Sequence, residues 1–221
     1  MERARDTDVT DFAGATPLVR ASRLAPGGRC YLKLELRNPT GSWWDRVAAR
    51  ATASVGTGAR ATLRCAPASA VIAFQCAARA RGFSLAAALD GEPTLEEKRT
   101  VALFGLEPAA LDAVDLGSAG LSDAYADLAA EIREALGGAP DVLVVPARTD
   151  FAAVARALGC RCVVAPTGTW ADVRSLARSE GLLAHPDAAS AAQFAATQPG
   201  VSVAILHETG ERSLSAGEGR S

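Results

Sequence analysis

Short apolar runs alternate along this chain with alanine-rich stretches of helical length, and the joints between them are short. Such alternation is typical of parallel β-strands joined by crossover helices, because a parallel pair needs a connection of a dozen or more residues. The chain is therefore predicted to have an α/β fold with a parallel sheet. Its 221 residues suffice for one sizeable domain or two small ones.

The clearest local pattern is a βαβ unit in the first half of the chain. Residues 61–65 and 83–89 are predicted strands, and residues 71–81 between them are a predicted helix that ends at Gly82. The other predicted strands are at 31–36, 141–146, 160–165 and 201–207, and the other predicted helices are at 44–55, 93–104, 122–136, 151–158, 170–179 and 188–196. From Ser213 the chain is polar and glycine-rich, so residues 213–221 are expected to form a flexible tail.

Net charge and cysteine content indicate which partners and which cellular compartment are expected. The net charge is −2 and the arginines are scattered, so no basic patch is predicted that would attract nucleic acid or a membrane surface. No apolar run approaches the roughly 20 residues that a membrane-spanning helix needs. The five cysteines form an odd set without CxxC spacing, and no charged-then-apolar leader begins the chain. A cytoplasmic protein is predicted.

One turn carries the strongest chemical signal, and it reads Asn38-Pro39-Thr40-Gly41-Ser42-Trp43-Trp44-Asp45-Arg46. It resembles the segment of the cysteine synthase, threonine synthase and tryptophan synthase β family whose lysine forms a Schiff base with pyridoxal phosphate (PLP). In this chain Trp44 takes the place of that lysine. An indole nitrogen is a donor only and cannot form an imine, so covalent capture of an aldehyde at this residue is excluded.

Further segments resemble the same family, fold-type II of the PLP-dependent enzymes, in the same order along the chain. They lie at residues 14–19, 32–35, 61–89, 141–146, 171–186 and 203–210. The resemblance implies an abridged, parallel-sheet, tryptophan synthase β-like architecture over residues 1–212. It also implies an alternative division into two small lobes, with a smaller lobe at about residues 45–115 inserted in the rest.

Two loops depart from the family pattern. Where the family has Ser-Gly-Asn-Thr-Gly, which holds the substrate carboxylate, this chain has Ala66-Pro67-Ala68-Ser69-Ala70, in which proline has no N–H and alanine has no polar side chain. Where the family has glycines around the phosphate, this chain has Ala147-Arg148-Thr149-Asp150, whose side chains are expected to crowd the space. Together with the lost lysine, these departures predict that no cofactor is bound and that PLP has been lost.

The remains of the family site define a degenerate cofactor pocket. Its predicted members are Ser42, Trp43, Trp44, Ala66, Ser69, Arg148, Thr149 and Thr209. Trp43 and Trp44 could fill the vacated space, anchor a partner protein or stack on a small ligand. These three alternatives stay open.

No catalytic residue is predicted firmly, and two side chains remain as candidates. Lys33 is one of only two lysines, the other being Lys98, and could rescue the Schiff base. Cys65 follows an expected strand and could act as a nucleophile with His185 or His207. A structural role is the simpler interpretation of both, and the Cys160–Cys162 pair is interpreted as buried thiols because no metal-ligand set accompanies it.

The sequence therefore predicts a catalytically inactive homologue of PLP-dependent enzymes. It would bind, scaffold or regulate, as a homodimer or with an active enzyme of amino-acid or natural-product biosynthesis, and could hold a small amino-acid-like ligand. Three alternatives remain: an enzyme with a rebuilt, non-PLP site in the old pocket that uses Cys65, Asp45, Arg148 or another cofactor, an amino-acid sensor, and a residual PLP-dependent lyase or synthase.

Overall fold

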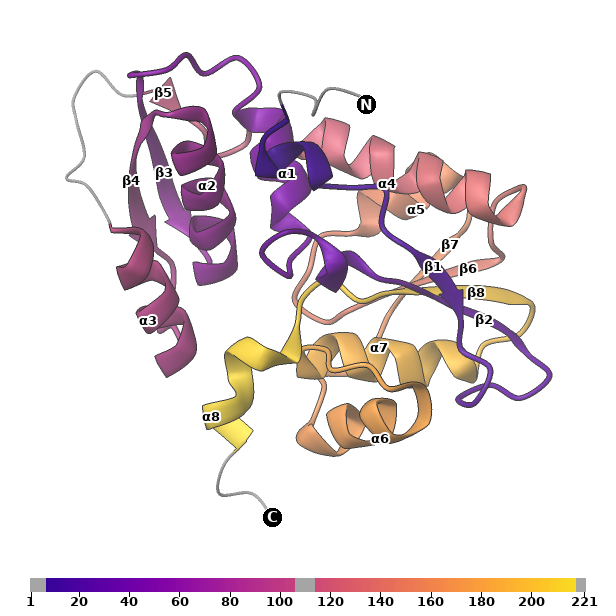
Figure 1. Ribbon diagram of the computed structural model, residues 1–221. Helices are drawn as coiled ribbons and strands as arrows, with labels where there is room; N and C mark the ends of the chain where they lie inside the picture. Colours follow the sequence, from indigo (N-terminus) through magenta and orange to yellow (C-terminus); the bar gives the residue numbers. More distant parts are fainter. Residues whose placement is uncertain (1–6, 106–113, 218–221) are drawn as a thin grey trace, which may run out of the picture. The chain divides into compact units, whose positions relative to one another are not determined.

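The computed structural model describes residues 7–105 and 114–217 (Figure 1). The chain divides into two compact units. Unit 1 consists of Met1–Gly14 and Asn38–Ala124, and unit 2 consists of Ala15–Arg37 and Tyr125–Ser221. Each unit has its own sheet.

Unit 2 is built on a five-stranded sheet with the order β1-β2-β8-β6-β7. The pairs β2–β8, β8–β6 and β6–β7 are parallel, and only β1 runs antiparallel to its neighbour. Parallel strands end at the same edge of a sheet, so the loops after β2, β6, β7 and β8 share one edge. The strands are β1 (Leu18–Arg20), β2 (Arg29–Lys33), β6 (Val142–Val145), β7 (Arg161–Val164) and β8 (Val201–Ile205).

Helices cover both faces of the unit 2 sheet, with α4 and α5 on one side and α6 and α7 on the other (Figure 1). Alanines at five buried positions of α7 let this helix lie close to the sheet, where it packs against β2, β6 and β8. β6 is buried at all four residues, as expected for a strand covered on both faces. The helical segments that belong wholly or mainly to unit 2 are α4 (Leu121–Leu136), α5 (Ala152–Leu158), α6 (Trp170–Glu180), α7 (Pro186–Ala196), α8 (Leu214–Gly217), η2 (Glu35–Arg37) and η3 (Gly210–Ser213).

Unit 1 contains a three-stranded parallel sheet with the order β4-β3-β5. Helix α2 packs against this sheet and against both α1 and α3. α3 begins with a capping box, in which the side chains of Thr94 and Glu97 each accept a backbone N–H of the other residue. The elements of unit 1 are η1 (Val9–Phe12), α1 (Trp44–Ala51), β3 (Arg60–Ala66), α2 (Ala68–Arg81), β4 (Ser84–Leu89), α3 (Leu95–Phe104) and β5 (Val114–Asp115).

The predicted α/β fold with a parallel sheet is confirmed, and most predicted elements lie within a few residues of their observed bounds. The remaining elements differ from the prediction as follows. β2 ends at Lys33, because the chain turns into a 3-10 helix where a longer strand was expected. α1 ends at Ala51 instead of Val55, and α8 occupies part of the expected flexible tail, whose residues 218–221 lie outside the described part. The short strands β1 and β5 were not predicted, since two or three residues carry little periodic signal.

In the parts of the chain described, no helix is both long and apolar enough to cross a bilayer.

Candidate functional site

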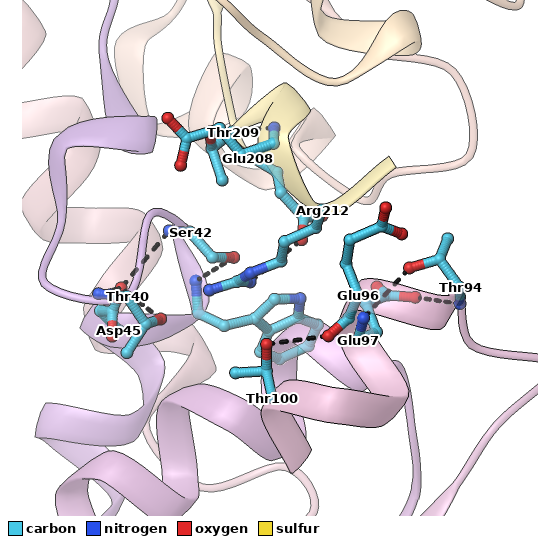
Figure 2. Close-up of polar contacts among 12 residues, drawn as sticks. Thr40, Ser42, Asp45, Thr94, Glu96, Glu97, Thr100, Glu208, Thr209 and Arg212 are labelled. Carbon is cyan, nitrogen blue, oxygen red and sulfur yellow. Dashed lines mark hydrogen bonds and ion pairs between the residues drawn. The ribbon is translucent and has the colours of Figure 1, made fainter. Parts of the chain in front are cut away.

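The turn before α1 is held by the carboxylate of Asp45. One oxygen of Asp45 accepts hydrogen bonds from the backbone N–H and the hydroxyl of Thr40, both at 3.0 Å, and a longer one from the N–H of Ser42 at 3.4 Å (Figure 2). Asp45 is 5% exposed and Ser42 is fully buried. The carboxylate thus has a structural role, which weighs against Asp45 as the catalytic group of a rebuilt site.

The two tryptophans of this turn lie differently. Trp43 is 5% exposed and belongs to the core of unit 1, whereas Trp44, the first residue of α1, is half-buried. Their ring centroids are 4.7 Å apart with a tilt of 41°, so each indole covers part of the other. The backbone N–H of Trp44 donates to the hydroxyl of Ser42 at 3.3 Å. The position that resembles the lysine site therefore holds an ordered indole at the start of a helix.

Lys33 lies in unit 2 at the end of β2, and its side chain is 1% exposed. Its ammonium donates to the backbone carbonyl of Thr16 and to a carboxylate oxygen of Glu131 at 2.6 Å. The two contacts occupy the ammonium, and burial keeps bulky reagents away from it. As a source of a nucleophilic amine, Lys33 is therefore poorly suited.

The 66–70 segment of unit 1 joins β3 to α2. Pro67 stands at the N-cap of α2 and makes no side-chain capping bond, so the first N–H groups of the helix have no cap from this residue. Ala66 and Ser69 are buried, at 6% and 5% exposure. The segment offers backbone donors at a helix start but no polar side chain except that of Ser69. Cys65 lies in β3, and its side chain is outside the described part of the structure.

The 147–150 loop of unit 2 follows β6 at the carboxyl edge of the sheet. Arg148 has φ of +60°, a conformation that glycine adopts readily and that other residues adopt at a cost. Across residues 7–105 and 114–217, no group accepts a hydrogen bond from the N–H groups of residues 147–150. The loop therefore keeps a glycine-like backbone with unpaired donors, although it contains no glycine. The hydroxyl of Thr149 donates back to the carbonyl of Pro146 at 2.7 Å.

The side chain of Arg148 points toward Asp187 and does not fill the space beside the loop. Its Nη2 and Nε donate to the same carboxylate oxygen at 2.7 and 3.2 Å. Asp187 is 3% exposed at the start of α7, and its other oxygen accepts the N–H of Gly168 at 2.8 Å. Gly168 is required here, because a Cβ would lie 1.9 Å from the carbonyl oxygen of Pro186. The side chain of Arg148 is 71% exposed, so it remains accessible.

Two histidines lie beside this ion pair. His185 is the N-cap of α7, and its Nδ1 accepts the N–H of Asp187 at 3.3 Å. His207 follows β8, and its ring centroid is 5.5 Å from that of His185. Burial, together with the charges of His185 and Arg148, lowers the pKa of His207 to about 3, while Asp187 acts in the opposite sense. The Nδ1 atom of His207 is buried and has no hydrogen-bond partner in the described part of the chain.

Thr209 lies in the loop after β8, where its hydroxyl caps the 3-10 helix η3 by accepting the N–H of Glu211 at 3.4 Å. The loop is tied to the residues before α7 by an antiparallel bridge between Thr209 and Ala184. Next to it, Glu208 and Arg212 form a largely buried ion pair at 3.2 Å. These contacts give the loop a fixed backbone.

The thiols described by the structure do not support cysteine chemistry. Burial raises the pKa of Cys30, Cys76, Cys160 and Cys162, so these thiols stay protonated near neutral pH. Cys162 is exposed and Cys160 half-buried, so the prediction that both are buried is wrong. Cys162 lies on β7, an edge strand of the sheet, and Cys160 directly precedes that strand. Within the described ranges, no cluster of three histidine, cysteine or acidic residues could hold a metal ion.

Of the predicted pocket residues, Arg148, Thr149 and Thr209 lie at the carboxyl edge of unit 2, and Lys33 ends a strand at that same edge. Ser42, Trp43, Trp44, Ala66 and Ser69 belong to unit 1. Asp187 was missed by the sequence analysis. The Pro186-Asp187 pair is a helix-start signal that could have moved the predicted start of α7 forward from residue 188.

Comparisons with known proteins agree with this fold. Residues 9–108 match the family model described as pyridoxal-phosphate dependent enzyme. The structure is similar to that of O-ureido-L-serine synthase, with 19% identity and a TM-score of 0.78, over 96% of this chain and 94% of that chain. The chain has the fold of the fold-type II PLP-dependent enzymes.

A second structure of O-ureido-L-serine synthase, a lysine-to-alanine variant with O-ureido-L-serine bound, gives 19% identity and a TM-score of 0.77, over 96% of this chain and 93% of that chain. The comparison with curated proteins gives no match.

The prediction that the chain binds no cofactor is contradicted by these findings, which point to PLP binding. The prediction assumed that side chains would crowd the 147–150 loop. Instead, Arg148 itself adopts the positive φ, its side chain lies against Asp187, and the loop N–H groups are unpaired. These donors fit a phosphate group, which backbone amides after a strand and an arginine both bind well. A missing amine at residue 44 removes one covalent bond and leaves non-covalent contacts available.

Proposed function

We propose that this protein is a catalytically inactive homologue of PLP-dependent enzymes that holds PLP without a covalent bond and acts as a binding or regulatory partner of another protein. The observation that carries the proposal is the indole at residue 44. Covalent anchoring of PLP requires a primary amine, which tryptophan does not have. When bound, PLP would supply an electron sink for reactions of amino acids, but this chain lacks the lysine that exchanges the cofactor onto a substrate.

Neither lysine of the chain is well placed to substitute for the missing amine. Lys33 is buried and paired with Glu131, and Lys98 lies exposed on α3 of unit 1. This distribution supports binding over covalent catalysis.

The 147–150 loop of unit 2 supports the retention of ligand binding. It would hold the phosphate through its N–H groups and Arg148. The O-ureido-L-serine bound to a lysine-to-alanine variant of a structurally similar synthase supports the idea that a lysine can be lost without loss of a ligand. A small amino-acid-like molecule is therefore a second ligand to test.

Equilibrium dialysis of the purified protein against PLP tests the proposal, followed by borohydride reduction and measurement of the intact mass. We expect saturable binding that is reversed by dialysis, with no gain in mass after reduction. PLP at 100 times its Kd should also raise the free energy of unfolding by about 2.7 kcal/mol. The variant Lys98→Arg is the control, because it removes the exposed amine that PLP could label non-specifically. A stoichiometric adduct on Lys33 would contradict the proposal.

The partner role needs a separate experiment. Light scattering on the purified protein would measure whether it forms a homodimer, and mixing it with an active PLP-dependent enzyme of the same organism would measure whether that enzyme's activity changes. We expect either a dimer or a change in the partner's activity. A monomer that alters no such enzyme would contradict a scaffolding or regulatory role.

A further inference from the structure

We propose that Arg148, positioned by Asp187, is the residue that makes the carboxyl edge of the unit 2 sheet selective for a phosphorylated ligand, with the buried ring of His207 as a second, uncharged contact. The inference rests on the proposed function, because it names the groups that would recognise the ligand at the same site. The proposed selectivity differs from that of a glycine-lined loop, because it comes from the guanidinium of Arg148 and depends on the carboxylate of Asp187.

The backbone at Arg148 is the first observation. A φ of +60° costs a residue with a Cβ free energy relative to glycine, and such strain is often found at functional positions. The Arg148 side chain reaches the carboxylate of Asp187, whose side chain is 3% exposed, while the Arg148 side chain as a whole stays 71% exposed. If Arg148 served only in packing, its side chain would not need to be exposed.

The geometry of the ion pair leaves donors for a ligand. Nε and Nη2 of Arg148 converge on one oxygen of Asp187, and the other oxygen is used by the N–H of Gly168. Of the five N–H groups of the guanidinium, three remain. Asp187 is thus a positioning residue, which fixes the plane of the fork without using all of it. Planar donor pairs of this kind bind phosphate oxygens with two parallel hydrogen bonds.

His207 supplies the second, independent observation. Its ring is 8% exposed, and Nδ1 is buried without a partner in the described part of the chain. Buried polar atoms are nearly always satisfied by protein, water or ligand, so an unpaired nitrogen marks a place where another polar group belongs. The ring lies beside His185 at the start of α7, the same helix end that carries Asp187. A neutral ring discriminates by hydrogen bonding and shape, and adds no charge.

Affinities for PLP and for pyridoxal, which lacks the phosphate, test the inference when measured by calorimetry on the full chain. For Arg148→Gln we expect the ratio of the two affinities to fall about tenfold to a hundredfold, because charge-assisted hydrogen bonds to phosphate are lost. Asp187→Asn keeps an acceptor for Gly168 but removes the charge that holds the fork, so the ratio should fall by less. With Arg148→Lys the ratio of the two affinities should fall by less than with Arg148→Gln, since an ammonium keeps the charge but lacks the planar donor pair.

His207→Phe should weaken the binding of PLP and pyridoxal by a similar factor and leave their ratio unchanged. A thermal melt of each variant without ligand reports whether the fold is intact. An unchanged ratio in Arg148→Gln would overturn the role of Arg148, and unchanged affinities in His207→Phe would overturn the role of His207, while the proposed function would stand. If the unsubstituted protein binds neither ligand, the proposed function itself fails.

Discussion

The 38–46 turn of unit 1 and the 147–150 loop of unit 2 offer a ligand different kinds of contact. The turn is held by Asp45, and Trp44 at the start of α1 has an indole and no amine. The loop contains no glycine, yet it has a positive φ at Arg148, unpaired N–H groups and an arginine side chain paired with Asp187. The difference supports the proposal that covalent anchoring and phosphate binding are separable, because the first depends on one atom and the second on a backbone shape.

Gly168→Ala is expected to have the largest effect, and it disturbs the support of the 147–150 loop. The new Cβ would lie 1.9 Å from the carbonyl oxygen of Pro186, so α7 would have to move and Asp187 would move with it. We expect a loss of at least about 4 kcal/mol in the free energy of unfolding. Chemical denaturation measures it.

The matched control is Gly138→Ala in the same unit, where a Cβ meets no atom within 4 Å. It should change stability by less than about 0.5 kcal/mol. Equal stability of the two alanine variants would mean that α7 does not depend on the close approach at Gly168.

In the 38–46 turn, substitutions of the two tryptophans show which ring is needed for packing and which position is open to a ligand. Trp43→Ala removes a side chain that is 5% exposed and should cost about 3–4 kcal/mol. Trp44→Ala removes a half-buried ring and should cost clearly less. Urea denaturation of both variants checks the order. If Trp44→Ala proved the more damaging, Trp44 would be a core residue and its position would not be open to a ligand.

Lys33 tests whether the remaining buried lysine is structural. Lys33→Met removes the cationic partner of Glu131 and should cost about 2–3 kcal/mol, somewhat below a fully buried pair because Glu131 is 24% exposed. The double variant with Glu131→Gln should recover part of this loss. PLP affinity should stay the same in both variants. Lower PLP affinity in Lys33→Met at unchanged stability would indicate that this amine meets the ligand.

The smallest predicted effect concerns pH. The folded state keeps His207 neutral down to its pKa of about 3, whereas the unfolded chain takes up a proton below about pH 6.5. Protons therefore favour the unfolded state between these values, and stability falls as the pH falls, by about 1.4 kcal/mol per pH unit.

From neutral pH to pH 5, this amounts to about 2 kcal/mol from His207. The expected consequence is that His207→Asn, which does not titrate, reduces the dependence by that amount. Identical pH profiles of the two proteins would show that His207 is already protonated in the folded state or exposed to solvent.

The fold could be predicted from the sequence because its signals are local. Gly82 ends α2 at the predicted residue, and the continuous apolar run of β6 predicts a strand buried on both faces. The short strand β1 could not be predicted, because its three residues pair through the sheet and not through their own pattern. Tertiary pairing decided that element.

The chemistry of the candidate residues could be read from the sequence, but the geometry of the site could not. The absence of an amine at Trp44 follows from the side chain alone, and the lost covalent anchor that it implies stays a prediction. Whether Arg148 blocks its loop depends on a backbone angle and on Asp187, which is 39 residues away in sequence. Sequence reasoning had no access to either, and it therefore predicted the loss of the cofactor, which the comparisons contradict.

The absence of a covalent anchor is tested most directly with two proteins, Lys98→Arg alone and Lys98→Arg combined with Trp44→Lys. Each is incubated with PLP, reduced with borohydride and weighed as an intact protein. We expect no change in mass for the protein that keeps Trp44, and a gain of one reduced cofactor per chain at residue 44 for the protein with Trp44→Lys. A stoichiometric gain in the protein that keeps Trp44 would contradict this expectation, because an amine elsewhere in the chain would then be the anchor.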